Sequence, residues 1–489
     1  MKQKFVTYEE FGAVGDGVHD DMQAIAQCHA YANAHGLAVR ARQDANYYIG
    51  GKAITAIIQT DTYWGKARFT IDDRAVEDRQ QNCFKAMPDQ EPFPLQLDRL
   101  SRDQQTLDMP QGCYYVSVED ENRRVYIRKG LNMDDGFTAT DRFLVENGQI
   151  QNPISWDYEK ITDAWAISTA DKPITIDGGI FTTIANEEPS FYNYYERNLR
   201  IQRSHVRVQN LTHYVENEGD QGAPYDGFIS IKWASFVTVR DCLMTAHKIY
   251  WTPSQIPDKL VAMGSYDLLA NDSIHVRFEN VTQTTDILDK AYWGIFCSNF
   301  CKELHLKDCV LSRFDAHCGV TNGSIVGCRL GHQGVNLIGF GDFRMEDTTV
   351  TAIQFLTFRS DYGSFFRGKL TVKNCRWVPM PGKLRPLRVF FCQNTGDHDF
   401  GYPCSLPNVE LELTIDDAQL PHDDISYVVF HIYDPDFAPG KPYPYGTPLQ
   451  LAGKVTVSSG RELKLCKNGE MFPNRQSYRL EIAGDPAAR

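Results

Sequence analysis

The sequence lacks the signatures of several protein classes. None of its 13 cysteines forms a CxxC pair, and the closest spacing is the CxxxC of Cys297 and Cys301. The spacings of zinc and iron–sulfur sites are therefore missing, and we expect neither a metal nor another cofactor. No run of about 18 apolar residues occurs, which excludes a membrane-spanning helix, and the first residues contain no apolar segment of a secretion signal. The sequence thus favours a cytoplasmic protein with reduced cysteines, unless a signal was removed from it.

The chain also has fewer basic than acidic residues. The chain has 50 Lys and Arg residues against 63 Asp and Glu, a formal net charge of −13. Nucleic acids bind to basic surfaces, so this balance argues against a nucleic-acid partner. It disfavours a strongly polyanionic glycan for the same reason, although a local cluster of Arg or Lys can still accept a single uronate. Aromatic residues make up 12% of the chain, and flat rings suit the faces of sugars as well as a protein core.

The N-terminal segment predicts a short capping unit. A glycine-rich turn precedes Asp20, the expected N-cap of a helix over residues 21–34. The segment FGAVGDGVHDDMQAI, residues 11–25, resembles the opening of pectate-lyase-superfamily proteins, a group that includes relatives of family 28 glycoside hydrolases and some phage tailspikes. The resemblance implies a right-handed parallel β-helix whose N-terminal end is capped by a helix. It also implies structural roles for Asp16, Asp20 and Asp21.

From residue 173 onward one sequence motif recurs. In it, a predicted strand of alternating apolar residues is followed by a small polar residue or Cys and then by another apolar residue. Aligned, the copies of the motif place seven residues in one column: Asn210, Cys242, Asn280, Cys309, Cys328, Thr348 and Cys375. Their spacings of 19 to 38 residues, with no helical pattern between them, predict a solenoid. We expect the column to form an internal ladder of stacked side chains.

A second short strand precedes each copy of the motif, and we expect these strands to form the sheet that lines a binding groove. The fold class predicted is all-β: a single-stranded, right-handed parallel β-helix with an N-terminal capping helix and a β-rich insertion. The domains expected are a cap with the first coils (1–75), an inserted β subdomain or lateral excursion (76–165), and the main β-helix (166–489).

Two groups of residues on or beside the predicted groove strands are candidates for catalysis. If Leu356 and Phe358 point inward, Arg359 and Asp361 point outward because strand side chains alternate. Arg beside Asp keeps the carboxylate ionised, as a nucleophile or base requires, or it grips a substrate carboxylate. The alternative is a surface salt bridge.

The second group is Asp315 and His317, in a predicted turn that leads into a groove strand. The carboxylate can orient the imidazole for proton transfer. The alternative is that both side chains satisfy backbone groups of the turn.

Other residues are candidates by their position beside the groove strands. Asp226 and Asp272 are further catalytic candidates, with turn formation as the alternative. The substrate-binding candidates are Tyr362, Lys232, His398, Asp399, Tyr402 and Trp293. The NTD, GHG and RIK motifs of family 28 polygalacturonases are absent where they are expected, which argues against pectin hydrolysis by that catalytic set.

The leading hypothesis is a glycoside hydrolase that uses Asp361 with Asp315, or Asp361 with Asp272 or Asp226, assisted by His317 and Arg359. A polysaccharide lyase is the alternative enzyme, with arginine neutralising a uronate and His, Tyr or Arg as the base. A glycan-binding or tailspike-like protein without turnover is the third hypothesis. The expected partner is a carbohydrate, and a homo-oligomer stays open.

Overall fold

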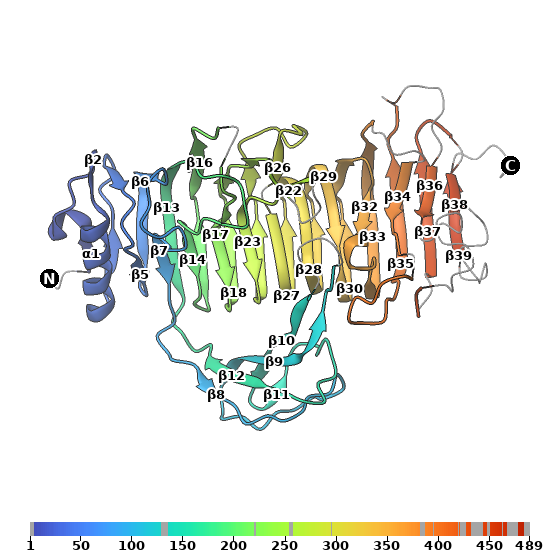
Figure 1. The fold of residues 1–489 in the computed structure, drawn as a ribbon, viewed down its shortest axis with the longest axis horizontal. Coiled ribbons are helices and arrows are strands. Elements are labelled where there is room, and N and C mark those ends of the chain that lie inside the picture. Colours follow the sequence, from blue (N-terminus) through green and yellow to red (C-terminus); the bar gives the residue numbers. More distant parts are fainter. Residues whose placement is uncertain are drawn as a thin grey trace.

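The computed structural model describes residues 4–128, 135–219, 222–253, 258–294, 296–381, 387–394, 396–418, 420, 427–431, 444–446, 450–461, 463–466 and 478–483. Strands stack along one long axis, with the N-terminal helix at one end (Figure 1). Consecutive coils pair in parallel, and the strands form three columns that we call sheets 1, 2 and 3. The predicted parallel β-helix with its capping helix and β-rich insertion is confirmed.

Sheet 1 is the column in which the predicted groove strands lie. It contains β5 (Ala56–Ile58), β7 (Phe84–Ala86), β14 (Leu199–Ile201), β17 (Asp226–Lys232), β23 (Tyr266–Asn271), the first part of β27 (Phe296–Lys307), the middle of β28 (Val310–Val326), the end of β29 (Arg329–Leu337), β32 (Leu356–Phe358), β34 (Leu387–Phe391), β36 (Tyr427–His431) and β38 (Leu463–Cys466).

Sheets 2 and 3 complete each coil. Sheet 2 contains β1 (Phe5–Thr7), β3 (Ala38–Arg40), the first halves of β6 (Thr62–Asp72) and β13 (Ile174–Ile184), β15 (Val206–Gln209), β18 (Ser235–Arg240), β24 (Ile274–Glu279), the ends of β27 and β28, β30 (Gly339–Glu346), β33 (Phe366–Pro379), β35 (Asn408–Ile415), β37 (Gln450–Val457) and β39 (Tyr478–Ala483). Sheet 3 contains β2 (Asp16–Asp20), β4 (Asn46–Ile49), the ends of β6 and β13, β16 (Thr212–Glu216), β19 (Leu243–Met244), β25 (Thr282–Gln283), the starts of β28 and β29, and β31 (Thr349–Ala352).

Inward side chains of the coils form one continuous apolar core. Ile229 and Ile231 of β17, and Leu356 and Phe358 of β32, are fully buried, so the predicted inward direction of Leu356 and Phe358 is confirmed. Burying such side chains contributes roughly 1.5–3 kcal/mol each. Because each coil can bury its inner face only against its neighbours, the stacking of coils is what stabilises the fold.

The predicted ladder column is wrong by one residue at two positions. Asn210 and Asn280 are exposed and have φ of 58° and 51°. They align with Asp241, Asp308 and Asn374, which share this left-handed conformation. Asn, Asp and Gly tolerate positive φ best, so this column forms the turn between sheets 2 and 3.

The buried column lies one residue further along the chain. It consists of Leu211, Cys242, Val281, Cys309, Cys328, Thr348 and Cys375. Its cysteines are free, and the Cys309 and Cys375 Sγ atoms lie 3.4 Å from the carbonyl oxygens of Phe278 and Met345 on the preceding coils. The small polarisable thiol therefore fits this narrow corner of the core.

Helix α1 (Met22–His35) covers the N-terminal end of the coils. Its N-cap is Asp21 rather than the predicted Asp20. The Asp21 carboxylate accepts hydrogen bonds from the Val14 and Gly15 amides at 2.6 and 3.0 Å. Asp16 accepts from the Val18 and His19 amides, so the expected structural roles of these carboxylates are confirmed.

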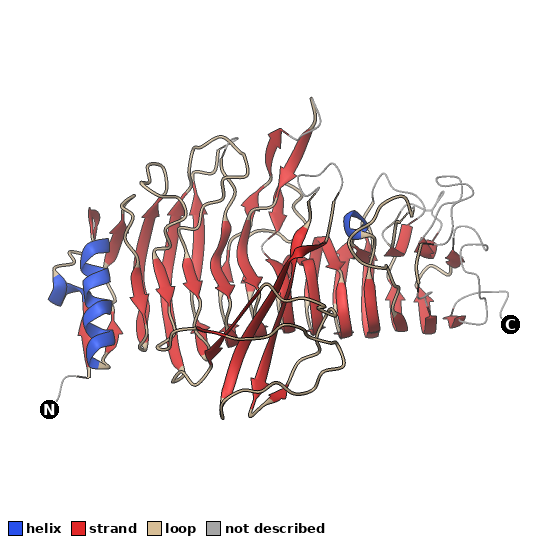
Figure 2. Ribbon diagram, turned by 60° about the horizontal axis from the view of Figure 1, so that its bottom comes forward, coloured by secondary structure: helices blue, strands red, loops and turns tan. Residues whose placement is uncertain are grey.

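The insertion is an antiparallel sheet that lies across the parallel coils (Figure 2). Its strands are β8 (Phe93–Pro94), β9 (Cys113–Val125), β10 (Phe137–Glu146), β11 (Gln149–Ile150) and β12 (Asp163–Ser168), in the order β11-β10-β9-β12-β8. It begins later than the predicted residue 76, because β7 pairs with β5 and β14 in sheet 1.

The insertion is attached to several coils. The Tyr115 hydroxyl donates to the Asp272 carbonyl after β23, and Lys302 of β27 lies 2.6 Å from Asp141. The Ile127 amide donates to the Phe400 carbonyl at 3.3 Å, beyond β34. The β9–β10 hairpin therefore reaches along the outside of the coils to sheet 1. In the described part of the chain, no helix is long and apolar enough to cross a membrane.

Shorter elements lie outside the three sheets. They are β20 (His247–Lys248) with β26 (Tyr292–Gly294), β21 (Tyr250–Pro253) with β22 (Leu260–Met263), and the 3-10 turns η1 (Tyr8–Phe11) and η2 (Ser360–Tyr362). These two strand pairs belong to the long connections that precede β23 and β27, and Figure 1 shows β22 and β26 at the upper edge of the coils.

Candidate functional site

The two carboxylates favoured by the sequence meet at one guanidinium on the outer face of sheet 1. Arg359 Nη1 lies 2.8 and 2.9 Å from the two oxygens of Asp315. Its Nε and Nη2 lie 3.1 and 2.7 Å from the two oxygens of Asp361. Arg313 pairs with Asp315, and Arg128 of the hairpin tip donates to Asp361 at 3.0 Å. We call these five residues the Arg–Asp cluster.

Both carboxylates of the cluster are held ionised. Burial by itself raises the pKa of Asp315 and Asp361, but the neighbouring guanidiniums outweigh it and bring both pKa values below the usual range. Asp315 has no exposed surface, whereas the Asp361 side chain is 21% exposed. Two ionised carboxylates cannot supply the proton that glycoside cleavage requires from its general acid.

This arrangement contradicts the predicted acid–base pair of Asp315 and Asp361. Both carboxylates are paired directly with Arg359 at 2.7–3.1 Å, so neither keeps the loosely held proton that the general acid of a glycosidase transfers. Asp315 also lies within strand β28 rather than in the predicted turn. The other predicted partners of Asp361 are too distant. Asp272 and Asp226 belong to coils four and five steps away in sheet 1, or roughly 19 and 24 Å at about 4.8 Å per coil.

His317 lies beside the cluster and is neutral. Its Nδ1 is 2.9 Å from the Asn299 Oδ1, and its Nε2 is 3.1 Å from the Tyr362 hydroxyl. Burial, and next the charge of Arg359, lower the pKa of His317 to about 3. Because both ring nitrogens are hydrogen-bonded, His317 orders this face rather than offering a free base.

Four of the predicted substrate-binding residues make structural contacts instead. Tyr362 is fully buried and Tyr402 is 5% exposed, so neither ring can stack on a sugar. The Tyr402 hydroxyl donates to the Tyr362 carbonyl at 2.9 Å. His398 Nε2 lies 3.0 Å from the Ile127 carbonyl and so connects its loop to the hairpin tip. Asp399 is exposed and accepts from the Gly401 amide at 2.8 Å, which caps a turn.

Asp272 occupies a corner turn beneath the insertion. Its φ is 47°, and its side chain lies 3.4 Å from Arg142 of β10. The turn-forming alternative to its predicted catalytic role is therefore the one that its position supports. Trp293 is half-buried under Arg313, whose Cζ is 4.5 Å from the ring centroid.

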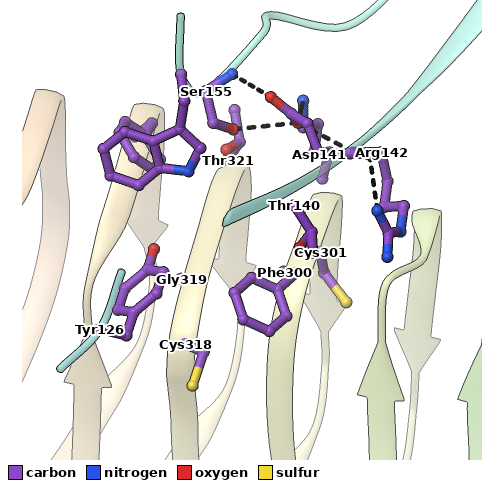
Figure 3. A pocket seen from close by; sticks show the side chains of 13 residues that line it. Tyr126, Thr140, Asp141, Arg142, Ser155, Phe300, Cys301, Cys318, Gly319 and Thr321 are labelled. Atoms are coloured by element: carbon purple, nitrogen blue, oxygen red, sulfur yellow. Dashed lines mark hydrogen bonds and ion pairs between the residues drawn. The ribbon is translucent and has the colours of Figure 1, made fainter. Parts of the chain in front are cut away.

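A small cavity separates the insertion from the coils. Figure 3 shows Tyr126 and Asp141 of the insertion facing Phe300, Cys318 and Thr321 of the coils. Its volume of about 20 Å3 has room for roughly one water molecule and none for a sugar. The cavity therefore belongs to the interface of the insertion, not to a substrate site.

A second group of charged side chains lies toward the N-terminal end of the same face. Arg200 Nη2 is 2.6 Å from Glu196 Oε2 and 4.0 Å from Asp226 Oδ2. The side chains of Glu196 and Asp226 keep 26% and 28% of their surface exposed, while Arg200 is 7% exposed. We call Glu196 and Asp226 the carboxylate pair.

The surroundings of the pair raise the pKa of Asp226. Partial burial, and next the charge of Glu196, raise the pKa of Asp226 to about 6. Arg200 and Lys232 oppose that shift. Burial also lowers the pKa of Lys85, which extends from the neighbouring coil, and Arg200 adds to the effect. A carboxyl that keeps its proton up to about pH 6 beside a second carboxylate is the arrangement that acid–base catalysis uses.

An exposed aromatic ring, Trp233, follows the other end of β17, seven residues along the chain from Asp226. Trp233 is 37% exposed, and the Lys232 ammonium lies 4.3 Å from its ring centroid. The sequence indicated Asp226 and Lys232 but missed Glu196 and Arg200. The strand Leu199–Ile201 is too short to show alternation, and Glu196 lies in a loop with no repeating pattern.

Metal-binding side chains do not gather anywhere in the part of the chain that the structure describes: no group of three or more His, Cys, Asp or Glu is placed to hold an ion.

Comparisons with known proteins concern the fold. No protein-family model matches the sequence, and no curated protein matches it. Among solved structures, the chain is similar to the Gp54 tailspike of Acinetobacter baumannii bacteriophage AP22, at 9% identity and a TM-score of 0.49, over 97% of this chain and 79% of that one. It is also similar to the Pseudomonas phage phi297 tailspike gp61, at 11% identity and a TM-score of 0.46, over 95% and 79%.

A third similar structure is the A-module of the Azotobacter vinelandii mannuronan C-5 epimerase AlgE6, at 10% identity and a TM-score of 0.39, over 98% of both chains. Function is therefore argued from the residues of this chain.

Proposed function

We propose that this protein is a glycoside hydrolase whose general acid is Asp226 and whose second catalytic carboxylate is Glu196. The observation that supports this best is that both carboxylates lie within 4.0 Å of one nitrogen of Arg200. Their oxygens are then at most about 6.6 Å apart, an upper bound that is compatible with the roughly 5–5.5 Å of retaining glycosidases.

The roles follow from the two environments. Asp226, with its raised pKa, gives its proton to the oxygen of the leaving sugar. Glu196 is positioned by the hydrogen bond from Arg200 and acts on the opposite side, as nucleophile or as the base for a water molecule. Both side chains are partly exposed, so a substrate can reach them.

The surroundings of the pair favour a sugar as the substrate. Phe191, Tyr192 and Trp251 are 58%, 44% and 57% exposed, and the hydrogen bond from the Thr252 hydroxyl to the Ser190 carbonyl joins their two loops. Trp233 offers a further exposed ring at the other end of β17. Large rings exposed together at one face mark an interaction surface. Rings with polar neighbours suit a sugar, whose faces are apolar and whose edges donate and accept hydrogen bonds.

The test is hydrolysis of a panel of neutral and acidic oligosaccharides, measured as newly formed reducing ends. Asp226→Asn and Glu196→Gln should each abolish most turnover, and Asp342→Asn, an exposed residue of sheet 2, should not. If the panel is cleaved equally by wild type and by both variants, the assignment fails.

Two other outcomes distinguish the alternatives. A product that absorbs in the ultraviolet signals β-elimination by a polysaccharide lyase. Saccharide binding without any product signals a glycan-binding protein. Either result would replace the hydrolase proposal.

A further inference from the structure

The Arg–Asp cluster carries more positive than negative charge. It contains three guanidinium groups and two carboxylates, and the adjacent His317 is neutral. Asp315 accepts from Arg313 and Arg359, and Asp361 accepts from Arg359 and Arg128. Every oxygen of the two carboxylates therefore accepts from a guanidinium, and one positive charge of the cluster is left unbalanced.

Hydrogen-bond donors are in excess at the same place. Within the described residues, Arg128 Nε, Arg313 Nε and Trp293 Nε1 are buried and have no acceptor within hydrogen-bond distance. The side chain of Arg313 is 6% exposed. Buried donors without acceptors are rare in folded proteins and call for an explanation. These three atoms are enclosed, so an anion bound at the solvent-exposed edge of the cluster would supply the missing negative charge rather than their acceptors.

Solvent can reach one side of the cluster. Arg128, Arg359 and Asp361 keep 17%, 13% and 21% of their side-chain surface exposed. Tyr192 is 44% exposed, and Arg128 is within electrostatic reach of its hydroxyl, whose pKa the guanidinium lowers against the effect of burial. An exposed ring beside an exposed guanidinium is a suitable surface for a sugar that carries an acidic group.

One loop connects this cluster to the carboxylate pair. Tyr192 and Glu196 are four residues apart, so their Cα atoms are at most about 14 Å apart. The loop is fixed between them, since the Ser190 carbonyl accepts from the Thr252 hydroxyl at 2.7 Å and the Tyr195 amide donates to Pro224 at 2.8 Å. The two places are about five coils apart, or roughly 24 Å at about 4.8 Å per coil, so an extended oligosaccharide that lies along the coils can contact both.

We propose that the exposed edge of Arg128 and Arg359 binds the acidic group, a carboxylate or a sulfate ester, of a glycan that is cleaved several sugar residues away at Glu196 and Asp226. This inference rests on the proposed function and adds the substrate class: a glycan with widely spaced acidic groups. The net charge of −13 agrees with sparse rather than dense charge on the substrate, because a polyanion would be repelled by the rest of the surface.

The experiment measures binding in the Asp226→Asn variant, so that turnover plays no part. The probes are glucuronate, glucose 6-sulfate and glucose, titrated by calorimetry. At least one acidic probe should bind about tenfold or more tightly than glucose, and which one binds identifies the acidic group. Binding should weaken as salt rises, since the contact is charge-dependent. Equal affinity for all three probes would overturn the proposal.

Variants of Arg128 then locate the site. Arg128→Gln should remove the preference for the acidic probe, and Arg128→Lys should retain part of it because the charge remains. Lys369→Gln, on sheet 2 and 45% exposed, is the matched control and should leave affinity unchanged. Thermal unfolding of each variant verifies that the hairpin still folds. If folded Arg128→Gln keeps the full preference, the site is elsewhere.

The two proposals fail in different ways. Loss of hydrolysis in every test, with acidic-probe binding intact, would remove the proposed function and leave the anion site. Hydrolysis of neutral and acidic oligosaccharides at equal rates, unaffected by Arg128→Gln, would remove the anion site and leave the hydrolase.

Discussion

The Arg–Asp cluster and the carboxylate pair lie on the same sheet face and have similar composition but opposite electrostatics. Each combines two carboxylates with three cations, the latter being Lys85, Arg200 and Lys232 around the pair. Asp361 has three guanidinium contacts of 3.1 Å or less. Asp226 has its nearest guanidinium nitrogen at 4.0 Å.

The pKa values follow this difference in distance. Direct ion pairs lower the pKa of Asp361, whereas partial burial raises that of Asp226 to about 6. Counting charges in a sequence therefore cannot separate a binding cluster from a catalytic one. The contact distances do so, because a paired carboxylate has lost its proton-transfer chemistry and a loosely paired one keeps it.

The largest effect expected is on turnover. Asp226→Asn should lower kcat by about 100- to 10,000-fold, the usual contribution of a general acid. Asp361→Asn should lower kcat far less, because that carboxylate does not transfer a proton. Steady-state rates on the best oligosaccharide of the panel measure both. A greater loss for Asp361→Asn would invert the comparison.

The free energy of unfolding, in contrast to turnover, should depend most on the Arg–Asp cluster. Arg359→Met leaves Asp315 and Asp361 without their shared cation, and breaking a buried ion pair in this way costs roughly 3–5 kcal/mol. Arg344→Met is the control, because Arg344 is 57% exposed and its ion pair is 3.9 Å long. That variant should change the free energy of unfolding by less than about 1 kcal/mol. Urea denaturation measures both, and equal costs would mean that the cluster is not a buried ion-pair network.

The pH dependence of activity should reflect Asp226 alone. A general acid must be protonated, so kcat/KM should fall as the pH rises through about 6, the pKa of Asp226. A rate profile over neutral and acidic pH measures the midpoint. A profile with no fall on its alkaline side would exclude Asp226 as the acid.

The pH dependence of stability should instead come from the Arg–Asp cluster. The pKa of Asp361 is lower in the folded protein than the ordinary 3.8. Its contribution is therefore present above that value and is lost as the pH falls toward the folded pKa. Asp361→Asn should flatten the acid side of the stability curve measured by urea midpoints. An unchanged slope would show that other carboxylates dominate.

The smallest effect expected is a shift in the pKa of the general acid, Asp226. Lys232 lowers the pKa of Asp226, so Lys232→Gln should raise the alkaline midpoint of kcat/KM by about half a pH unit. Arg128→Gln, distant along the sheet, should leave that midpoint in place. A shift of equal size in both variants would mean that the two groups are not electrostatically separate.

Sequence patterns were sufficient for the fold and for part of the site. Period-2 strands at solenoid spacing predicted the coils, and strand alternation predicted that Arg359 and Asp361 point to the same face. The predicted ladder column was wrong by one residue at Asn210 and Asn280. The sequence motif does not distinguish a turn residue at positive φ from the buried residue that follows it. Backbone conformation, not composition, distinguishes them.

The missing parts of the site come from outside the repeat. Arg128 contacts Asp361 across 233 residues of chain, and its position depends on where the inserted hairpin meets the coils. Glu196 reaches Asp226 through a loop whose path no periodicity encodes. Long-range contacts made by insertions and loops carry no local signal.

The insertion has a consequence for how the protein unfolds. In a solenoid each coil contacts only its neighbours, so partial opening can spread from an end one coil at a time. Here the inserted sheet is attached to the coils of β23 and β27, to Asp361 and to the loop at Phe400. Those coils are thereby joined into one cooperative unit that must open together. We expect their amides to exchange with deuterium at a common rate while the coils outside this span exchange independently.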